Sequence, residues 1–226
     1  MRLFISCLAA LVCFGTAHFT LDPAWVRRVP FLRPRDTEGL PEPKTLAPAL
    51  RWVLAAMVGL ASGFAAWRAW TAPDGIERAK LLCALVLVVG AGCIDLTEYR
   101  IPNLFPLALA LCGIALLAIG LLTGQNGAFS NATGSVLSAV ICAACLLIAM
   151  FLSRRGIGMG DIKLLAALAL CVGFRALIGV IFYGMLFCAL TAVSLLIFKK
   201  KTIRDAIPFG PFIAFGYLFT LCVRYF

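Results

Sequence analysis

The feature that most constrains this chain is a succession of apolar runs, each close to the roughly 20 residues that cross a bilayer as a helix. Apolar residues make up 63% of the 226 positions and charged residues only 13%, against roughly 45–50% and ~25% in average soluble domains. This composition excludes a soluble globular protein and predicts an all-α, polytopic membrane protein. Eight candidate spans are found: 3–20, 52–70, 81–96, 104–123, 134–152, 162–174, 176–198 and 209–225.

Two of these spans leave alternatives open. Only Gly173, Phe174 and Arg175 separate the sixth span from the seventh, so the pair is either a tight helical hairpin or one longer broken segment. The first span resembles a secretory signal, but no good small-x-small cleavage site is followed by an exported soluble domain. We interpret it as a retained anchor.

The distribution of Lys and Arg indicates the orientation. With the N-terminus outside, 13 of the 20 Lys and Arg residues fall in the inside loops and six in the outside segments, which predicts that both termini are outside. The formal net charge of +10 is therefore attributed to topology and anionic lipid, and no nucleic-acid partner is expected. The segment 21–50 carries six prolines and is interpreted as a polar linker on the inside.

The cysteines and the one histidine do not form a pattern typical of a metal site. The ten cysteines lie almost wholly inside apolar runs, where Cys behaves as a small hydrophobe. Cys142 and Cys145 form one C-x-x-C, but no second pair or nearby His completes a zinc site. His18 lies in the first apolar run and is interpreted as structural. We expect no metal and no cofactor.

Two acids stand at the edges of apolar runs. Asp95 ends the run that begins at Leu81, and Asp161 opens the run that begins at Ile162. The deduced topology places both at the inside face. An acid this close to hydrocarbon costs a few kcal/mol and is a functional candidate by default.

The residues around the two acids sharpen this expectation. Asp95 lies about two turns before Pro102, which stops a helix, and Asn103 is able to cap the next one. Asp161 directly follows Gly158-Met-Gly160, and such glycines let another backbone approach closely. Two carboxylates can share one proton, one acting as a base on water and the other as an acid.

The alternative is that the two acids are merely interfacial, with Asp161 serving as a helix N-cap. A phosphate-binding loop fits poorly, because the Gly-rich segment lacks a Gly-Lys-Ser/Thr ending and an Asp at a helix start repels anions. Lys163 lies two residues past Asp161, and residues at this spacing do not share a helix face. We therefore expect Lys163 to point away from the acids, toward the lipid headgroups.

Three segments in order resemble the type IV prepilin peptidase family, the prepilin branch of the G-x-G-D intramembrane aspartic proteases. The first joins Asp95 to Ile101-Pro102-Asn103, and the second is Gly158-Met-Gly160-Asp161 with the residues that follow. The third is Ile207-Pro208-Phe-Gly210-Pro211. A presenilin-like protease would carry Tyr-Asp and Pro-Ala-Leu motifs, whereas here Ile94 precedes Asp95 and Pro-Phe-Gly-Pro stands near the C-terminus.

The resemblance implies an aspartic endopeptidase of the inner membrane with its active site facing the cytoplasm. Its substrates would be type IV prepilins, pseudopilins or archaeal preflagellin-like proteins, with a short basic leader followed by a hydrophobic helix. Asp95 and Asp161 would be catalytic. The substrate cleft would be formed by Gly158, Gly160, Ile101, Pro102, Asn103, Pro208, Gly210 and Pro211.

The same resemblance divides the chain into three parts. These are an anchor helix and linker (1–50), a second membrane helix with its outside loop (51–80), and a six-helix catalytic core (81–226). Many bacterial members carry two C-x-x-C pairs between their first two helices, associated with N-methylation, but the segment 21–50 contains no cysteine. The chain thus resembles the peptidase-only members, including those of Tad/Flp pilus systems.

Two other classes of function remain to be weighed. A proton-coupled transporter also uses acids within a membrane, but it would call for acids near the midplane and an internal repeat, and the sequence shows neither. A structural membrane subunit with an inactive pair of acids is the other alternative. Cleavage of a prepilin in membranes distinguishes a protease from both.

Overall fold

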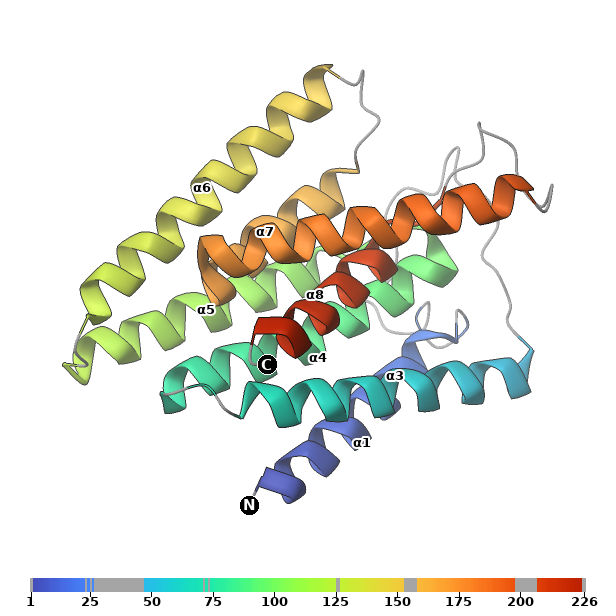
Figure 1. The fold of residues 1–226 in the computed structure, drawn as a ribbon, viewed down its shortest axis with the longest axis horizontal. Coiled ribbons are helices and arrows are strands. Elements are labelled where there is room, and N and C mark those ends of the chain that lie inside the picture. Colours follow the sequence, from blue (N-terminus) through green and yellow to red (C-terminus); the bar gives the residue numbers. More distant parts are fainter. Residues whose placement is uncertain are drawn as a thin grey trace.

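The protein is described by a computed structural model, which covers residues 2–22, 24, 26, 47–70, 72, 74–124, 127–152, 158–197 and 207–224. Within these ranges the regular structure is entirely helical (Figure 1). In the part of the chain that the structure describes, six helices are long and apolar enough to cross a membrane, which confirms an all-α, multi-pass membrane protein. The elements are α1 (Arg2–Thr20), α3 (Pro48–Ala69), α4 (Gly75–Glu98), α5 (Leu104–Leu122), α6 (Ala128–Leu152), α7 (Met159–Ile197) and α8 (Gly210–Arg224).

The sixth and seventh predicted spans both lie in α7, which is broken at Gly173. This residue has φ 73° and ψ 174°, a conformation that is essentially confined to glycine. Figure 1 shows the two halves of α7 turning back on each other, so the hairpin alternative is correct. The first half and the 15-residue α8 each extend roughly 20 Å at 1.5 Å per residue. Both are shorter than the roughly 30 Å of a hydrocarbon core.

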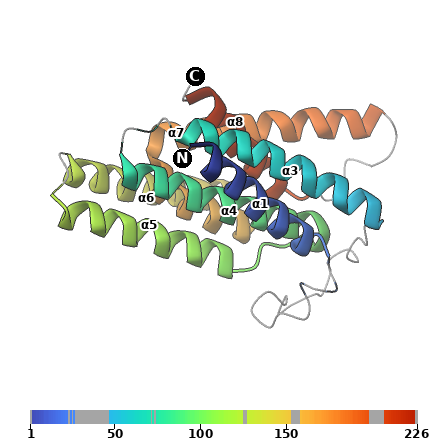
Figure 2. The ribbon, with the colours of Figure 1, turned by 90° about the horizontal axis from the view of Figure 1, so that it is seen from below.

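α4 is the central helix of the bundle. It contacts α1, α3, α5, α7 and α8, and 61% of its most apolar window is buried. The buried Tyr217 hydroxyl donates a hydrogen bond to the Leu81 carbonyl (2.8 Å), which ties α8 to α4. α6 lies at the edge of the bundle, against α7 and α5 (Figure 2), and only 17% of its apolar window is buried. Its exposed apolar face is typical of a helix in contact with lipid.

The first two described helices pack against each other. Arg51 Nη1 lies 2.9 Å from Asp22 Oδ2, an ion pair that joins the end of α1 to the start of α3. The rings of His18 and Trp52 have centroids 4.0 Å apart in the same interface. Most of the predicted linker, and the basic groups at 154–155 and 199–201, lie outside the described residues.

Candidate active site

Asp95 lies in the last turn of α4 with its side chain turned into the protein. The residue is buried, with 5% of its surface exposed. α4 ends just beyond it, because Tyr99 takes a left-handed conformation (φ 54°) and donates its backbone N–H to the Asp95 carbonyl (3.0 Å). The chain then turns through Pro102 into α5. Asp95 is thus held at the point where a membrane helix stops.

The carboxylate of Asp95 reaches the start of another helix. Its Oδ2 accepts a hydrogen bond from the backbone N–H of Gly210 (2.8 Å), the first residue of α8. The first N–H groups of a helix have no partner within that helix, and its positive end attracts an anion. A Cβ atom at position 210 would lie 2.8 Å from Asp95 Cβ. Only glycine therefore allows α8 to begin so close to the carboxylate.

Asp161 lies in the first turn of α7 and comes from a different part of the chain. It is the third helical residue, and its backbone N–H bonds to the Gly158 carbonyl (3.1 Å). Gly158 therefore occupies the position that flanks the helix, and the structure does not support the alternative of Asp161 as an N-cap. Gly160 brings α7 close to Ile101, because a Cβ built at 160 would lie 3.2 Å from Ile101 Cβ.

The two acids share one pocket of about 530 Å³. They are near enough for the charge of Asp95 to act on the Asp161 carboxylate. The Asp95 carboxylate is buried against a helix start, whereas Asp161 is partly exposed. The residues that line this acidic pocket are Asp95, Tyr99, Arg100, Ile101, Asn103, Gly158, Met159, Gly160, Asp161 and Lys163.

The remaining predicted site residues lie near the acidic pocket but do not line it. Pro102 belongs to the loop before α5, and Pro208 and Pro211 flank the start of α8, where both are partly buried. Gly210 also contributes no lining surface and touches Asp95 from behind through its backbone. Of the ten predicted residues, the structure thus gathers six around the pocket and places four behind or beside it.

The expectation for Lys163 is wrong. Its Nζ donates a hydrogen bond to Asn103 Oδ1 (3.1 Å), and both residues line the acidic pocket. The argument from helix faces fails here because the pocket lies over the end of α7, where side chains from more than one face reach the same space. Tyr99, Arg100 and Met159 also line the pocket and were not expected from the sequence. Their proximity to the two motifs was the only available signal.

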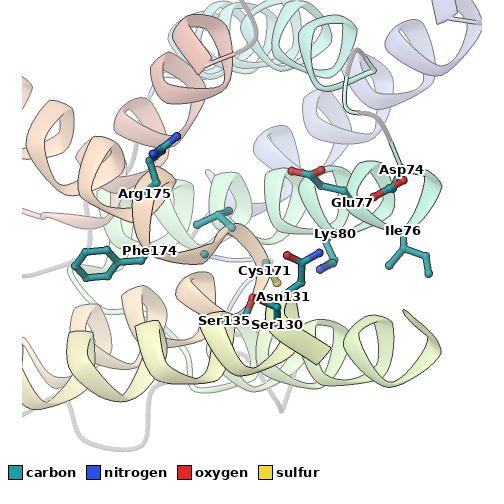
Figure 3. A pocket seen from close by; sticks show the side chains of 13 residues that line it. Asp74, Ile76, Glu77, Lys80, Ser130, Asn131, Ser135, Cys171, Phe174 and Arg175 are labelled. Carbon is teal, nitrogen blue, oxygen red and sulfur yellow. The ribbon is translucent and has the colours of Figure 1, made fainter. Parts of the chain in front are cut away.

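A second polar pocket lies at the other end of α4. Asp74 precedes α4 and lies 21 positions before Asp95, which corresponds to roughly 30 Å along the helix, the thickness of a hydrocarbon core. Figure 3 shows Asp74, Glu77 and Lys80 near the start of α4, with Arg175 from beyond the break in α7. Its two acids, Asp74 and Glu77, come from one short stretch at the start of α4. It lacks the paired carboxylates from separate helices that the acidic pocket has.

No metal site is evident in the parts of the chain that the structure describes, where no three His, Cys, Asp or Glu side chains come together suitably. A buried, hydrogen-bonded carboxylate and a second carboxylate beside it are suited to general acid and base catalysis by a pair.

Comparison with known proteins agrees with this description. Residues 80–193 match the type IV leader peptidase family. A prepilin leader peptidase/N-methyltransferase of Burkholderia pseudomallei is 34% identical over 73% of this chain and 53% of its own length. One from Aeromonas hydrophila is 30% identical over 63% and 48%, and one from Xanthomonas campestris 28% identical over 66% and 50%. The chain spans about half the length of these relatives.

No solved structure matches the chain significantly. The matched segment takes in both aspartates of the acidic pocket, together with α5, α6 and most of α7. It covers half of the chain, and the similarity to Burkholderia extends over nearly three quarters. This protein therefore belongs to the type IV leader peptidase family.

Proposed function

We propose that this protein is an intramembrane aspartic endopeptidase that removes the basic leader of type IV prepilins, pseudopilins or archaeal preflagellin-like proteins. The observation that carries the proposal is the meeting of Asp95 and Asp161, from separate helices, in one pocket. The family and the relatives' names support a leader peptide as the substrate. The two aspartates are the catalytic residues of this proposal.

The proposed reaction is a direct hydrolysis. One aspartate accepts a proton from a water molecule, whose oxygen forms a bond to the carbonyl carbon of the scissile peptide. The other aspartate donates a proton to the nitrogen as the C–N bond breaks, which releases the leader as a carboxylic acid and the mature protein as an amine. The Gly210 N–H keeps Asp95 in place throughout. No acyl-enzyme and no cofactor are needed.

The proposed setting is the inner membrane, with the acidic pocket at the cytoplasmic face. The excess of Lys and Arg in the loops assigned to the inside supports this orientation. The ends of α4 and the starts of α5, α7 and α8 then lie together at that face. A substrate anchored by its own helix would present its leader junction at the same depth.

We further propose that this chain does not methylate the new N-terminus. The support is the segment 21–50, which contains no cysteine, whereas the two C-x-x-C pairs of the bifunctional members stand in the corresponding loop. Cleavage and methylation can be read from one measurement, because the mass of the mature N-terminus reports both.

The test is co-expression with candidate prepilins and detection of leader removal by mass spectrometry. Asp95→Asn and Asp161→Asn nearly preserve shape while removing the ionisable group, and each should reduce cleavage to background at an unchanged level of protein in the membrane. Cleavage that survives in either variant would contradict the assignment of the pair. Absence of cleavage by the wild-type protein with every candidate would favour a transporter or structural subunit.

A further inference from the structure

A second cavity adjoins the acidic pocket and lies further along the membrane helices. It is an apolar groove of about 560 Å³ between α5, α6 and the first half of α7. Asn103 and Lys163 line both the groove and the acidic pocket. The two cavities are therefore contiguous, and the hydrogen bond between Lys163 and Asn103 marks the place where polar surroundings give way to apolar ones.

The groove is lined largely by small side chains, and the larger residues on its walls are exposed. Val140 and Leu107 lie on its walls and are 60% and 58% exposed. Small residues in membrane helices allow another helix to approach closely, so that packing forces hold the two together. Five of the lining residues are alanines: Ala110, Ala139, Ala143, Ala166 and Ala167.

Both walls of the groove are fixed to α7 by hydrogen bonds beside it. Ser138 of α6 donates to the Ala169 carbonyl (3.2 Å), and Cys171 donates to the Leu109 carbonyl of α5 (3.7 Å). Figure 1 shows α5 and α6 leaving their shared loop and diverging. The groove is therefore a built feature of the helix packing, with α7 as its floor.

We propose that this groove receives the hydrophobic helix of the substrate, on the mature side of the bond cleaved in the acidic pocket. The inference rests on the proposed function. A prepilin changes from a polar leader to an apolar helix at its cleavage point. The protein changes in the same way at Asn103 and Lys163, from a polar pocket lined by two carboxylates and two cations to an apolar groove. The leader therefore lies in the acidic pocket and the apolar helix of the substrate lies in the groove, which sets the direction of the bound substrate.

A photo-crosslinking experiment tests this site without relying on turnover. A benzoylphenylalanine is placed at Val140 in the groove or, as the matched control, at Ile141, the next residue, which is exposed at the same depth but does not line the groove. Both variants carry Asp161→Asn and are co-expressed with a tagged type IV prepilin. We expect the crosslink from position 140 to map to the prepilin helix and to exceed that from position 141 at least tenfold.

Two tryptophan variants of the active protein test the groove by their effect on KM and kcat. Ala143→Trp fills the groove, whereas Ala144→Trp adds the same bulk at the neighbouring exposed position outside it. We expect the first to raise KM for a full-length prepilin at least tenfold with kcat within twofold, and the second to change neither, because the groove only holds the substrate.

The outcomes separate this inference from the proposed function. Normal cleavage by the wild-type protein, with equal crosslinks at 140 and 141 or crosslinks only to lipid or a second copy, would overturn the groove alone. Failure of the wild-type protein to cleave, with a strong crosslink at 140, would overturn the proposed function and leave the groove as a helix-binding site. If the wild-type protein does not cleave and position 140 gives no crosslink to the prepilin helix, both the groove and the proposed function would be overturned.

Discussion

Replacing Gly210 by alanine should disable the acidic pocket without removing either aspartate. The added Cβ would lie 2.8 Å from Asp95 Cβ and 2.9 Å from its Oδ2, whereas ordinary contacts begin at 3.4 Å. Asp95 and the start of α8 must therefore separate by about 0.6 Å. The contact involves the beginning of a side chain and a helix backbone, so neither partner can easily move aside.

This separation is large enough to break the bond that positions the carboxylate. Adding about 0.6 Å to the present 2.8 Å takes the Gly210 N to Asp95 Oδ2 distance beyond the 2.7–3.2 Å of a normal hydrogen bond. A hydrogen bond to a charged group contributes about 1.5–3 kcal/mol. Since 1.36 kcal/mol corresponds to a factor of ten in rate, we expect kcat/KM for prepilin cleavage to fall roughly 10- to 150-fold.

The assay is cleavage of a full-length prepilin in membranes, normalised to the amount of folded protein that elutes normally after solubilisation. Gly15→Ala is the matched control, because a Cβ at position 15 meets nothing within 4 Å. It should cleave as the wild type does. A Gly210→Ala protein that is folded and retains kcat/KM within threefold of wild type would refute the role given to this hydrogen bond.

Three further changes have distinct expected results. Gly173→Ala should lower the free energy of unfolding by about 1–3 kcal/mol, since φ 73° with ψ 174° is strained for alanine; unfolding in mixed detergent and SDS micelles measures this, and an unchanged midpoint would contradict it. Tyr217→Phe should lower stability by about 1 kcal/mol through loss of the bond to Leu81, with kcat/KM per folded molecule unchanged. Asn103→Ala should reduce kcat/KM less than tenfold, because its bond to Lys163 is exposed and contributes about 1 kcal/mol; a complete loss of cleavage would show a larger role.

Much of the fold could be predicted because the apolar runs are long and clearly bounded. The predicted runs over 3–20 and 104–123 agree with α1 and α5 to within a residue or so. The bounds of α8 and of the first half of α7 were harder to predict, because the length of an apolar run does not show where it stops being helical. Gly173 was placed correctly at a break, but its left-handed conformation, and with it the choice of a hairpin, depends on tertiary packing that the sequence pattern does not contain.

The candidate site was predictable to the extent that it depends on residue type. Asp95 and Asp161 stood out because carboxylates at the edge of apolar runs are costly. The link between Asp95 and Gly210 could not be predicted, because its donor is a backbone N–H that every residue except proline possesses. Lys163 was placed wrongly because spacing along α7 carries no information about Asn103, which lies just before α5.

The bond between Asp95 and Gly210 joins residues 115 positions apart, and this separation sets an order of events during synthesis. At about 5–20 residues per second, the ribosome needs roughly 6–23 seconds after adding Asp95 to supply its partner. During that interval the carboxylate has no helix start to hold it. A nascent chain therefore holds Asp95 in its final position only when the last described helix enters the bundle. A ribosome-bound protein that lacks α8 is expected to cut prepilins made beside it more slowly than the finished protein does.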